Sequence, residues 1–172
     1  KKEAEDFLNQ NIGSKYKVAD LETKPTKKSP TAPFTTSTLQ QEAARKLYLP
    51  VGITMQLAQR LYEAGLITYM RTDSVNLSKE AMDAAQAEII KSYGKEFSKP
   101  RVFANKSKGA QEAHEAIRPT DMSRHTVNID RDQARLYDLI WKRTLASQMS
   151  DAQLERTNVK IEADNHSEIF TA

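Results

Sequence analysis

Apolar residues recur three or four positions apart through the middle of the chain, which is the spacing of one face of an α-helix. These runs predict helices over residues 39–49, 53–64, 78–93 and 130–150. A similar pattern over residues 1–12 predicts an N-terminal helix. A shorter pattern over residues 111–117 predicts one more helix, which Pro119 stops because proline has no N–H to donate.

Residues that favour helix starts stand before the four central runs. Thr38 and Asp130 each open a stretch that resembles a capping box, and Thr54 and Ser78 can each cap with a hydroxyl. The helix over residues 130–150 is the longest, and we interpret Trp141 within it as a core residue and not as a platform for stacking bases.

The two ends of the chain follow the two-residue period of β-strands. Residues 15–22 and 157–163 predict strands, and residues 169–172 begin a returning strand after a polar turn. Residues 23–33 contain three prolines and predict a linker or an extended crossing segment. We therefore expect an α+β protein, mainly helical, whose flanking strands lie together in one sheet.

The helices over residues 39–49 and 53–64 are joined by a short turn with Pro50 and Gly52, and an extended stretch follows them. This order is typical of a helix-turn-helix. In the extended stretch, Tyr69, Arg71 and Asp73 alternate, so all three point to one side if the stretch is a strand.

A phenol beside a guanidinium suggests attack on a phosphodiester, because positive charge stabilises a phenolate and arginine can hold two phosphate oxygens. A Tyr-x-Arg pattern alone is more commonly structural, and Arg71 could instead form a salt bridge with Asp73 or Glu63. The residues by themselves leave both interpretations open.

Composition narrows the class of protein only a little. The 172 residues carry a formal net charge of +3 and no cysteine, which excludes disulfides and thiolate metal sites. No apolar run is long enough to span a membrane. Residues 91–108 hold six bases and one acid, which fits either a solvated loop or contacts with phosphates. The start at Lys1 and the end within a strand lead us to expect a piece of a longer protein.

Several kinds of catalysis have little support in the sequence. His114, His125 and His166 are dispersed, and no Asp or Glu cluster has the spacing of metal ligands. The chain has neither the nucleophile elbow of serine hydrolases nor a glycine-rich phosphate loop.

Three sequence blocks together resemble the type IA DNA topoisomerases, in the form found in bacterial topoisomerase I. The first block, residues 66–74, resembles the active-site tyrosine segment of that family, the second is residues 113–120, and the third and weaker one is residues 33–43. The blocks stand in the order of the family, and the resemblance covers residues 15–172.

The resemblance implies roles for five residues. Tyr69 would be the nucleophile that forms a 5′-phosphotyrosine link to a single DNA strand, with a 3′-hydroxyl released. Arg71 and His114 would act at the scissile phosphate, and Asp73 and Arg118 would support DNA binding. A helical domain over residues 31–152, with a helix-turn-helix-like core, would be inserted into a β-rich arching or hinge domain made of residues 1–30 and 153–172.

The resemblance also implies what this chain lacks and where it works. The acidic domain that binds Mg²⁺ near the tyrosine lies outside this sequence, so we expect no metal ligands here and no activity of the chain by itself. The full protein would relax negatively supercoiled DNA without ATP, as a cytoplasmic, nucleoid-associated monomer acting on a single-stranded segment. A non-enzymatic helix-turn-helix DNA-binding module is the main alternative, and a purely structural or protein-interaction domain is a third.

Overall fold

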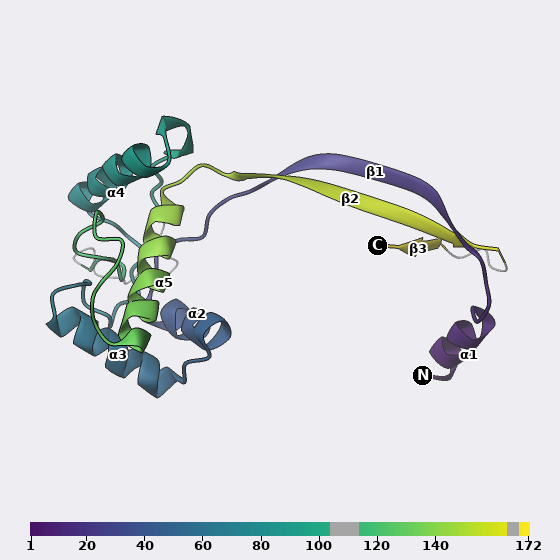
Figure 1. The fold of residues 1–172 in the computed structure, drawn as a ribbon, viewed down its shortest axis with the longest axis horizontal. Coiled ribbons are helices and arrows are strands. Elements are labelled where there is room, and N and C mark those ends of the chain that lie inside the picture. The colour runs from purple at the N-terminus through teal and green to yellow at the C-terminus, as the bar shows by residue number, and fades with distance from the viewer. Residues whose placement is uncertain (104–113, 165–168) are drawn as a thin grey trace. The chain divides into compact units, whose positions relative to one another are not determined.

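The computed structural model describes residues 1–103, 114–164 and 169–172. It divides into two compact units, one made of Lys1–Lys28 and Ala152–Ala172 and the other of Ser29–Asp151. The second unit thus lies, in chain order, between the two segments of the first (Figure 1). Helices and an antiparallel sheet are both present, which confirms the predicted α+β class.

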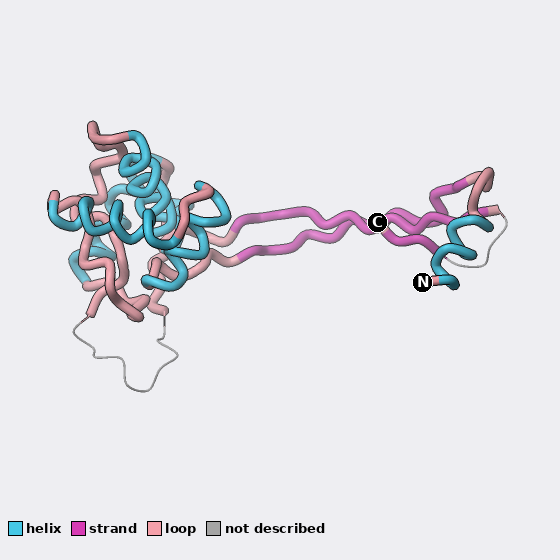
Figure 2. Tube along the Cα trace, turned by 90° about the horizontal axis from the view of Figure 1, so that it is seen from below, coloured by secondary structure: helices cyan, strands magenta, loops and turns pink. Residues whose placement is uncertain are grey.

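The first unit is a three-stranded antiparallel sheet in the order β1-β2-β3, with helix α1 (Lys2–Gln10). Strand β1 (Tyr16–Lys28) pairs with β2 (Ala152–Ala163) along its whole length, from Tyr16 opposite Ala163 to Lys28 opposite Ala152. The short strand β3 (Ile169–Thr171) pairs with β2 on its other side. Figure 2 shows the two long strands running side by side. The N-terminal strand and the two C-terminal strands thus lie in one sheet, as predicted.

Of the two alternatives predicted for residues 23–33, a linker or an extended crossing segment, the linker is wrong for the first half, because residues 23–28 are extended and belong to β1. Pro25 lies opposite Glu155 in the ladder. The sheet tolerates this proline because β1 is an edge strand, where a missing N–H need not break a hydrogen bond to a further strand.

The second unit is a helical domain whose core gathers around α5 (Arg131–Ser147). Helices α2 (Thr36–Leu47), α3 (Val51–Glu63) and α4 (Lys79–Ser92) pack against it, and a short 3₁₀ helix, η1 (Lys95–Phe97), follows α4. Fully buried side chains from these elements include Leu39, Leu61, Ile89, Leu136, Ile140 and Leu145. Trp141 is also buried, and its Nε1 donates to the carbonyl of Met122 at 2.9 Å, which confirms its assignment to the core.

Two of the predicted helix caps are confirmed and two are wrong. The side chains of Ser78 and Asp130 accept hydrogen bonds from the first turns of α4 and α5. Helix α2 instead begins at Thr36, where Thr35 is the cap and Thr38 completes a reciprocal capping box. Helix α3 begins at Val51, and Thr54 is buried in its first turn, where its hydroxyl donates to the carbonyl of Pro50 at 3.1 Å.

Candidate active site

The segment that carries Tyr69 leaves the end of α3 through a tight turn. Gly65 has a φ of +70°, a backbone conformation that side chains with a Cβ rarely adopt, and its N–H donates to the carbonyl of Tyr62 at 2.8 Å. Beyond the turn, Ile67 and Met70 are each 1% exposed and hold the segment to the core. Tyr69 lies between them with 45% of its surface exposed.

Exposed and buried side chains alternate along this segment. Tyr69, Arg71 and Asp73 are exposed, whereas Met70 and Ser74 are buried. The segment is not a continuous strand, since its only β-bridge within the described residues joins Ile67 to Pro119. The ring of Tyr69 meets the ring of Tyr62 edge to face, with centroids 5.2 Å apart. Helix α3 thus supports one side of the phenol.

The helix predicted over residues 111–117 is wrong for residues 114–117, which are not helical. Residues 111–113 lie outside the described part of the chain. The backbone of this segment bonds to its neighbours instead of to itself. Ala116 N donates to Asn76 O at 2.8 Å, and Ile117 N donates to Phe34 O at 2.8 Å. These tertiary hydrogen bonds replace the ones that a helix would make.

Two threonine hydroxyls hold the backbone on either side of Tyr69 and Arg71. Thr68 Oγ1 donates to Ala116 O at 2.7 Å and accepts from Arg118 N at 3.0 Å. Thr36 Oγ1, at the start of α2, donates to Met70 O at 2.7 Å and accepts from Thr72 N at 2.9 Å. The backbone N–H of Thr36 also donates to Thr72 O at 2.9 Å. Two segments distant in sequence thereby fix one short stretch of backbone.

A hollow of about 510 Å³ opens beside this stretch. Arg71, Asp73 and His114 line it together with hydroxyl-bearing residues, namely Thr35, Thr36, Ser37 and Thr72. The hydroxyl groups come mainly from the start of α2, where the helix dipole favours an anion. A guanidinium, an imidazole and a helix N-terminus around one hollow suit a phosphate group.

Arg71 has no ion-pair partner among the residues that the structure describes. The alternative salt bridge to Asp73 or Glu63 is not formed there, and Glu63 accepts a hydrogen bond from Gln59 instead, at 2.7 Å. An exposed guanidinium without an internal partner keeps its five donors available to a ligand.

Arg118 differs from the other predicted site residues because its guanidinium is already engaged. It forms two hydrogen bonds to Glu115 Oε2, at 2.6 and 3.2 Å, and a third to Pro119 O at 2.9 Å. Only 15% of its side chain is exposed, and it does not line the hollow. This geometry gives Arg118 a structural role, and its contact with DNA stays a prediction.

Glu115 connects Arg118 to the start of α4. Its Oε1 accepts from the N–H of Ser78 at 2.6 Å. Burial acts to raise the pKa of Glu115, but the hydrogen bonds from Arg118 and Ser78 outweigh it and hold the pKa below its ordinary value. The sequence reasoning missed Glu115, Thr68 and Thr36 as structural parts of the site, although each lies in one of the three motif blocks.

No group of three or more His, Cys, Asp or Glu side chains lies close enough to hold a metal ion within residues 1–103, 114–164 and 169–172. The residues at the hollow therefore do not fit a metal site.

In the basic run of residues 91–108, Lys99 and Arg101 both pair with Asp151, at 3.4 and 2.7 Å, whereas Lys106 and Lys108 lie outside the described residues. Among the described helices, none is both long and apolar enough to cross a membrane.

The family model of DNA topoisomerases matches residues 1–172, so the chain belongs to the DNA topoisomerase family. Its relatives are bacterial proteins of the topoisomerase I type. It is 57% identical over 148 residues to DNA topoisomerase 1 of Zymomonas mobilis, covering 85% of this chain and 12% of that protein. It is 50% identical over 168 residues to DNA topoisomerase 1 of Synechococcus elongatus, covering 95% of this chain and 19% of that protein.

A solved structure has the same fold. Full-length topoisomerase I from Thermotoga maritima matches 98% of this chain with a TM-score of 0.76 and 36% sequence identity, and the match covers 29% of that structure. The chain thus spans less than a third of the length of each of these three relatives.

Proposed function

We propose that this chain is the tyrosine-bearing part of a type IA topoisomerase that relaxes negatively supercoiled DNA. The observation that carries the proposal is the exposed Tyr69 phenol. It lies two residues along the chain from Arg71, which lines a hollow suited to phosphate. In the proposed reaction the Tyr69 oxygen attacks the phosphorus and loses its proton. The bond from phosphorus to the 3′ oxygen breaks, and that oxygen leaves as a 3′-hydroxyl after taking up a proton.

The product is a 5′-phosphotyrosine link, which conserves the energy of the broken bond. Religation is the reverse attack by the 3′-hydroxyl after another strand has passed, so no ATP is needed. Arg71 and His114 act on the scissile phosphate, whose negative charge they offset in the transition state. Asp73 lines the same hollow and assists in positioning the strand.

The Mg²⁺ of the proposed enzyme does not belong to this part of the molecule. Because the described residues offer no cluster of ligands, the metal would be held by other parts of the full-length protein. This chain alone should fold but neither cleave nor relax DNA. We further propose that the full protein is a monomer that acts on a single-stranded segment of chromosomal DNA, in the cytoplasm at the nucleoid.

The test uses the full-length protein, a single-stranded oligonucleotide and a denaturing gel that reveals covalent adducts. Tyr69→Phe keeps the ring and removes only the oxygen, so the adduct should disappear while the fold remains. Tyr62→Phe is the matched control, because it removes the oxygen of the phenol that packs against Tyr69, and its adduct should persist.

Two results would contradict the proposal. An adduct formed by Tyr69→Phe would exclude Tyr69 as the nucleophile. Salt-dependent DNA binding without any adduct in the native protein, in the presence of Mg²⁺, would instead support the non-enzymatic helix-turn-helix alternative.

A further inference from the structure

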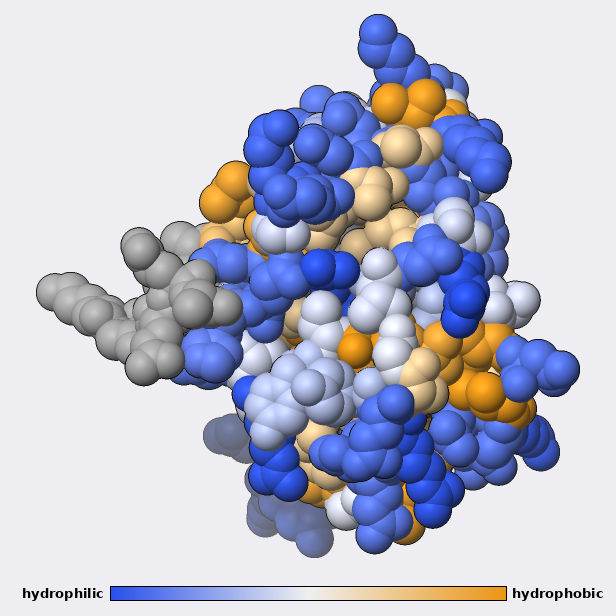
Figure 3. All heavy atoms as spheres, turned by 90° about the vertical axis from the view of Figure 1, so that its left-hand side faces the viewer, coloured by the Kyte–Doolittle hydropathy of each residue, from blue (hydrophilic) through white to orange (hydrophobic). Residues whose placement is uncertain are grey.

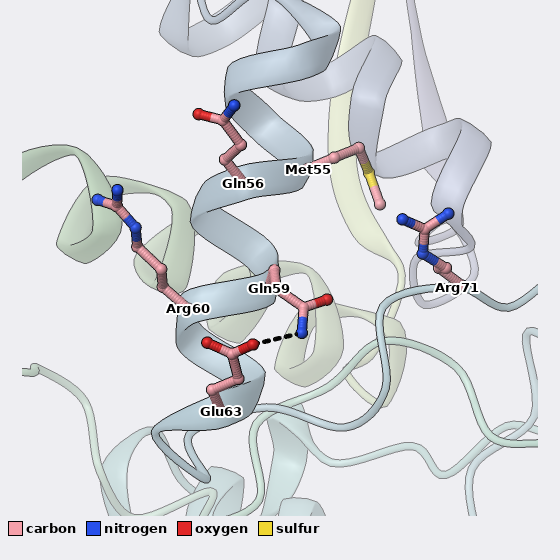
Figure 4. A pocket seen from close by; sticks show the side chains of 6 residues that line it. All are labelled: Met55, Gln56, Gln59, Arg60, Glu63 and Arg71. Atoms are coloured by element: carbon pink, nitrogen blue, oxygen red, sulfur yellow. Dashed lines mark hydrogen bonds between the residues drawn. The ribbon is translucent and has the colours of Figure 1, made fainter.

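A second hollow, of about 360 Å³, lies along the outer side of α3. It is lined by five residues of that helix, Met55, Gln56, Gln59, Arg60 and Glu63, and by Arg71. In Figure 4, Gln56 and Arg60 reach along one side of α3, and Met55 and Arg71 flank the other side. Arg71 therefore borders both this α3 hollow and the hollow that contains His114.

The charges of the α3 hollow favour an anionic, hydrogen-bonding ligand. Arg60 is exposed, and neither it nor Arg71 has an ion-pair partner within the described residues. The single carboxylate, Glu63, already accepts a hydrogen bond from the Gln59 amide (Figure 4). Gln56 is exposed and can present both a donor and an acceptor, as the edge of a base requires.

One face of the molecule has a mainly hydrophilic surface. Figure 3 shows hydrophilic side chains over most of one face of the molecule, with apolar ones in small patches between them. The hollow is lined by two guanidinium groups without an ion-pair partner in the described part of the chain, by two glutamines and by one carboxylate. Such a lining fits a nucleotide better than an apolar peptide.

The proposed chemistry decides which nucleotide this is. After cleavage the 5′-phosphate stays on Tyr69, so the part of the protein that carries Tyr69 must also hold the strand on that side of the break. The ring of Tyr62 on α3 contacts the ring of Tyr69. Arg71, which we propose to bind the scissile phosphate, also lines the α3 hollow. The α3 hollow thus shares Arg71 with the hollow proposed to hold the scissile phosphate.

We propose, on the basis of the proposed function, that the α3 hollow binds the nucleotide adjoining the scissile phosphate on its 5′-phosphotyrosine side. Arg60 contacts the next phosphate along the strand, and the Gln56 amide meets the edge of the base. This site retains the cleaved end while the other strand passes, and it gives α3 a role in reading the sequence beside the break.

The experiment measures oligonucleotide binding by the full-length protein in a Tyr69→Phe background, so that cleavage does not contribute. The oligonucleotides share one upstream arm, and their downstream arm is shortened one nucleotide at a time. Arg60→Ala should weaken binding of the longest oligonucleotide roughly tenfold, as expected for a lost bond to a charged group. The plot of log affinity against log salt should also become less steep by about 0.7, the value for one phosphate on a single strand.

The length dependence distinguishes this site from general electrostatic attraction. When the downstream arm is too short to reach Arg60, the Arg60→Ala protein should bind as well as its parent. Gln56→Ala should change the preference for the downstream base and leave the salt slope unaltered. Arg45→Ala is the charge-matched control on α2, where Arg45 pairs with Glu42, and it should not alter the length dependence.

An Arg60→Ala protein that keeps the parental salt slope and length dependence would overturn the inference. So would an equal loss of affinity at every downstream length. The adduct assay on the native protein separates this failure from failure of the proposed function. If the native protein forms adducts but Arg60→Ala leaves DNA binding unchanged, only the α3 site is refuted. Absence of adducts in the native protein refutes both.

Discussion

Thr36→Val tests whether the start of α2 positions Arg71. The substitution keeps the shape of the side chain but removes the hydroxyl that donates to Met70 O at 2.7 Å and accepts from Thr72 N at 2.9 Å. These two backbone groups flank Arg71. The remaining bond, from the Thr36 N–H to Thr72 O, is unaffected because it belongs to the main chain.

The expected loss follows from the two bonds and their exposure. A net hydrogen bond contributes about 1 kcal/mol, and water can replace part of the loss because Thr36 is only half-buried. We therefore expect a destabilisation of about 1–2 kcal/mol. For a chain of this length it corresponds to a fall in Tm of roughly 3–6 °C.

Thermal unfolding of the 172-residue chain and cleavage by the full-length protein are the two assays. Thr36→Ser keeps the hydroxyl and should retain most of the stability and cleavage. Thr126→Val is the control at an exposed position of the same helical unit and should change stability by less than about 0.5 kcal/mol. The positioning role would be refuted if Thr36→Val cleaved as fast as Thr36→Ser, whatever its Tm.

Two further predictions concern stability alone. Glu115→Gln should destabilise the chain by about 1–2 kcal/mol at neutral pH, because it removes the charged partner of Arg118. Since the pKa of Glu115 is lowered in the folded chain, this contribution is complete above the ordinary value of 4.5 and is lost as the pH falls through the lowered pKa. The two proteins should thus approach equal stability in acid, and a difference that grows with acidity would contradict the reasoning. Tyr48→Gly should stabilise the chain by about 0.5–1 kcal/mol, because Tyr48 is 86% exposed at a φ of +58° that glycine adopts without strain. Tyr48→Ala, which keeps a Cβ, should give no such gain in urea unfolding.

The helices of the second unit could be predicted because their periodic apolar faces are the faces that pack. Leu57, Ala58 and Leu61 share one face of α3 and are all buried. The exact caps were harder to predict, because several hydroxyl residues compete near one helix start. Thr35 and Thr38 both stand before the apolar run of α2, and only the folded backbone decides that Thr35 is the cap.

The segment that contains residues 114–117 shows why a local pattern can fail. Residues 114–117 contain good helix formers, yet their backbone groups bond to Asn76 and Phe34, which lie far away in the sequence. No local rule predicts a partner at that separation. The same reasoning applies to β1. Pro25 indicates a linker unless one knows that β1 is an edge strand, with β2 on one side and no strand on the other in the sheet β1-β2-β3.

The contacts between the three motif blocks explain what most of their residues do. Thr36 from the third block holds the backbone around Arg71, and Ile117 from the second block bonds to Phe34 of the third. Thr68, from the first block, bonds to the second block at Ala116 and Arg118. Only a few side chains in these blocks remain available to a ligand, Arg71 above all. The motifs are therefore mainly a scaffold for one short stretch of backbone, and the alternating pattern of Tyr69, Arg71 and Asp73 exposes the groups that the scaffold presents.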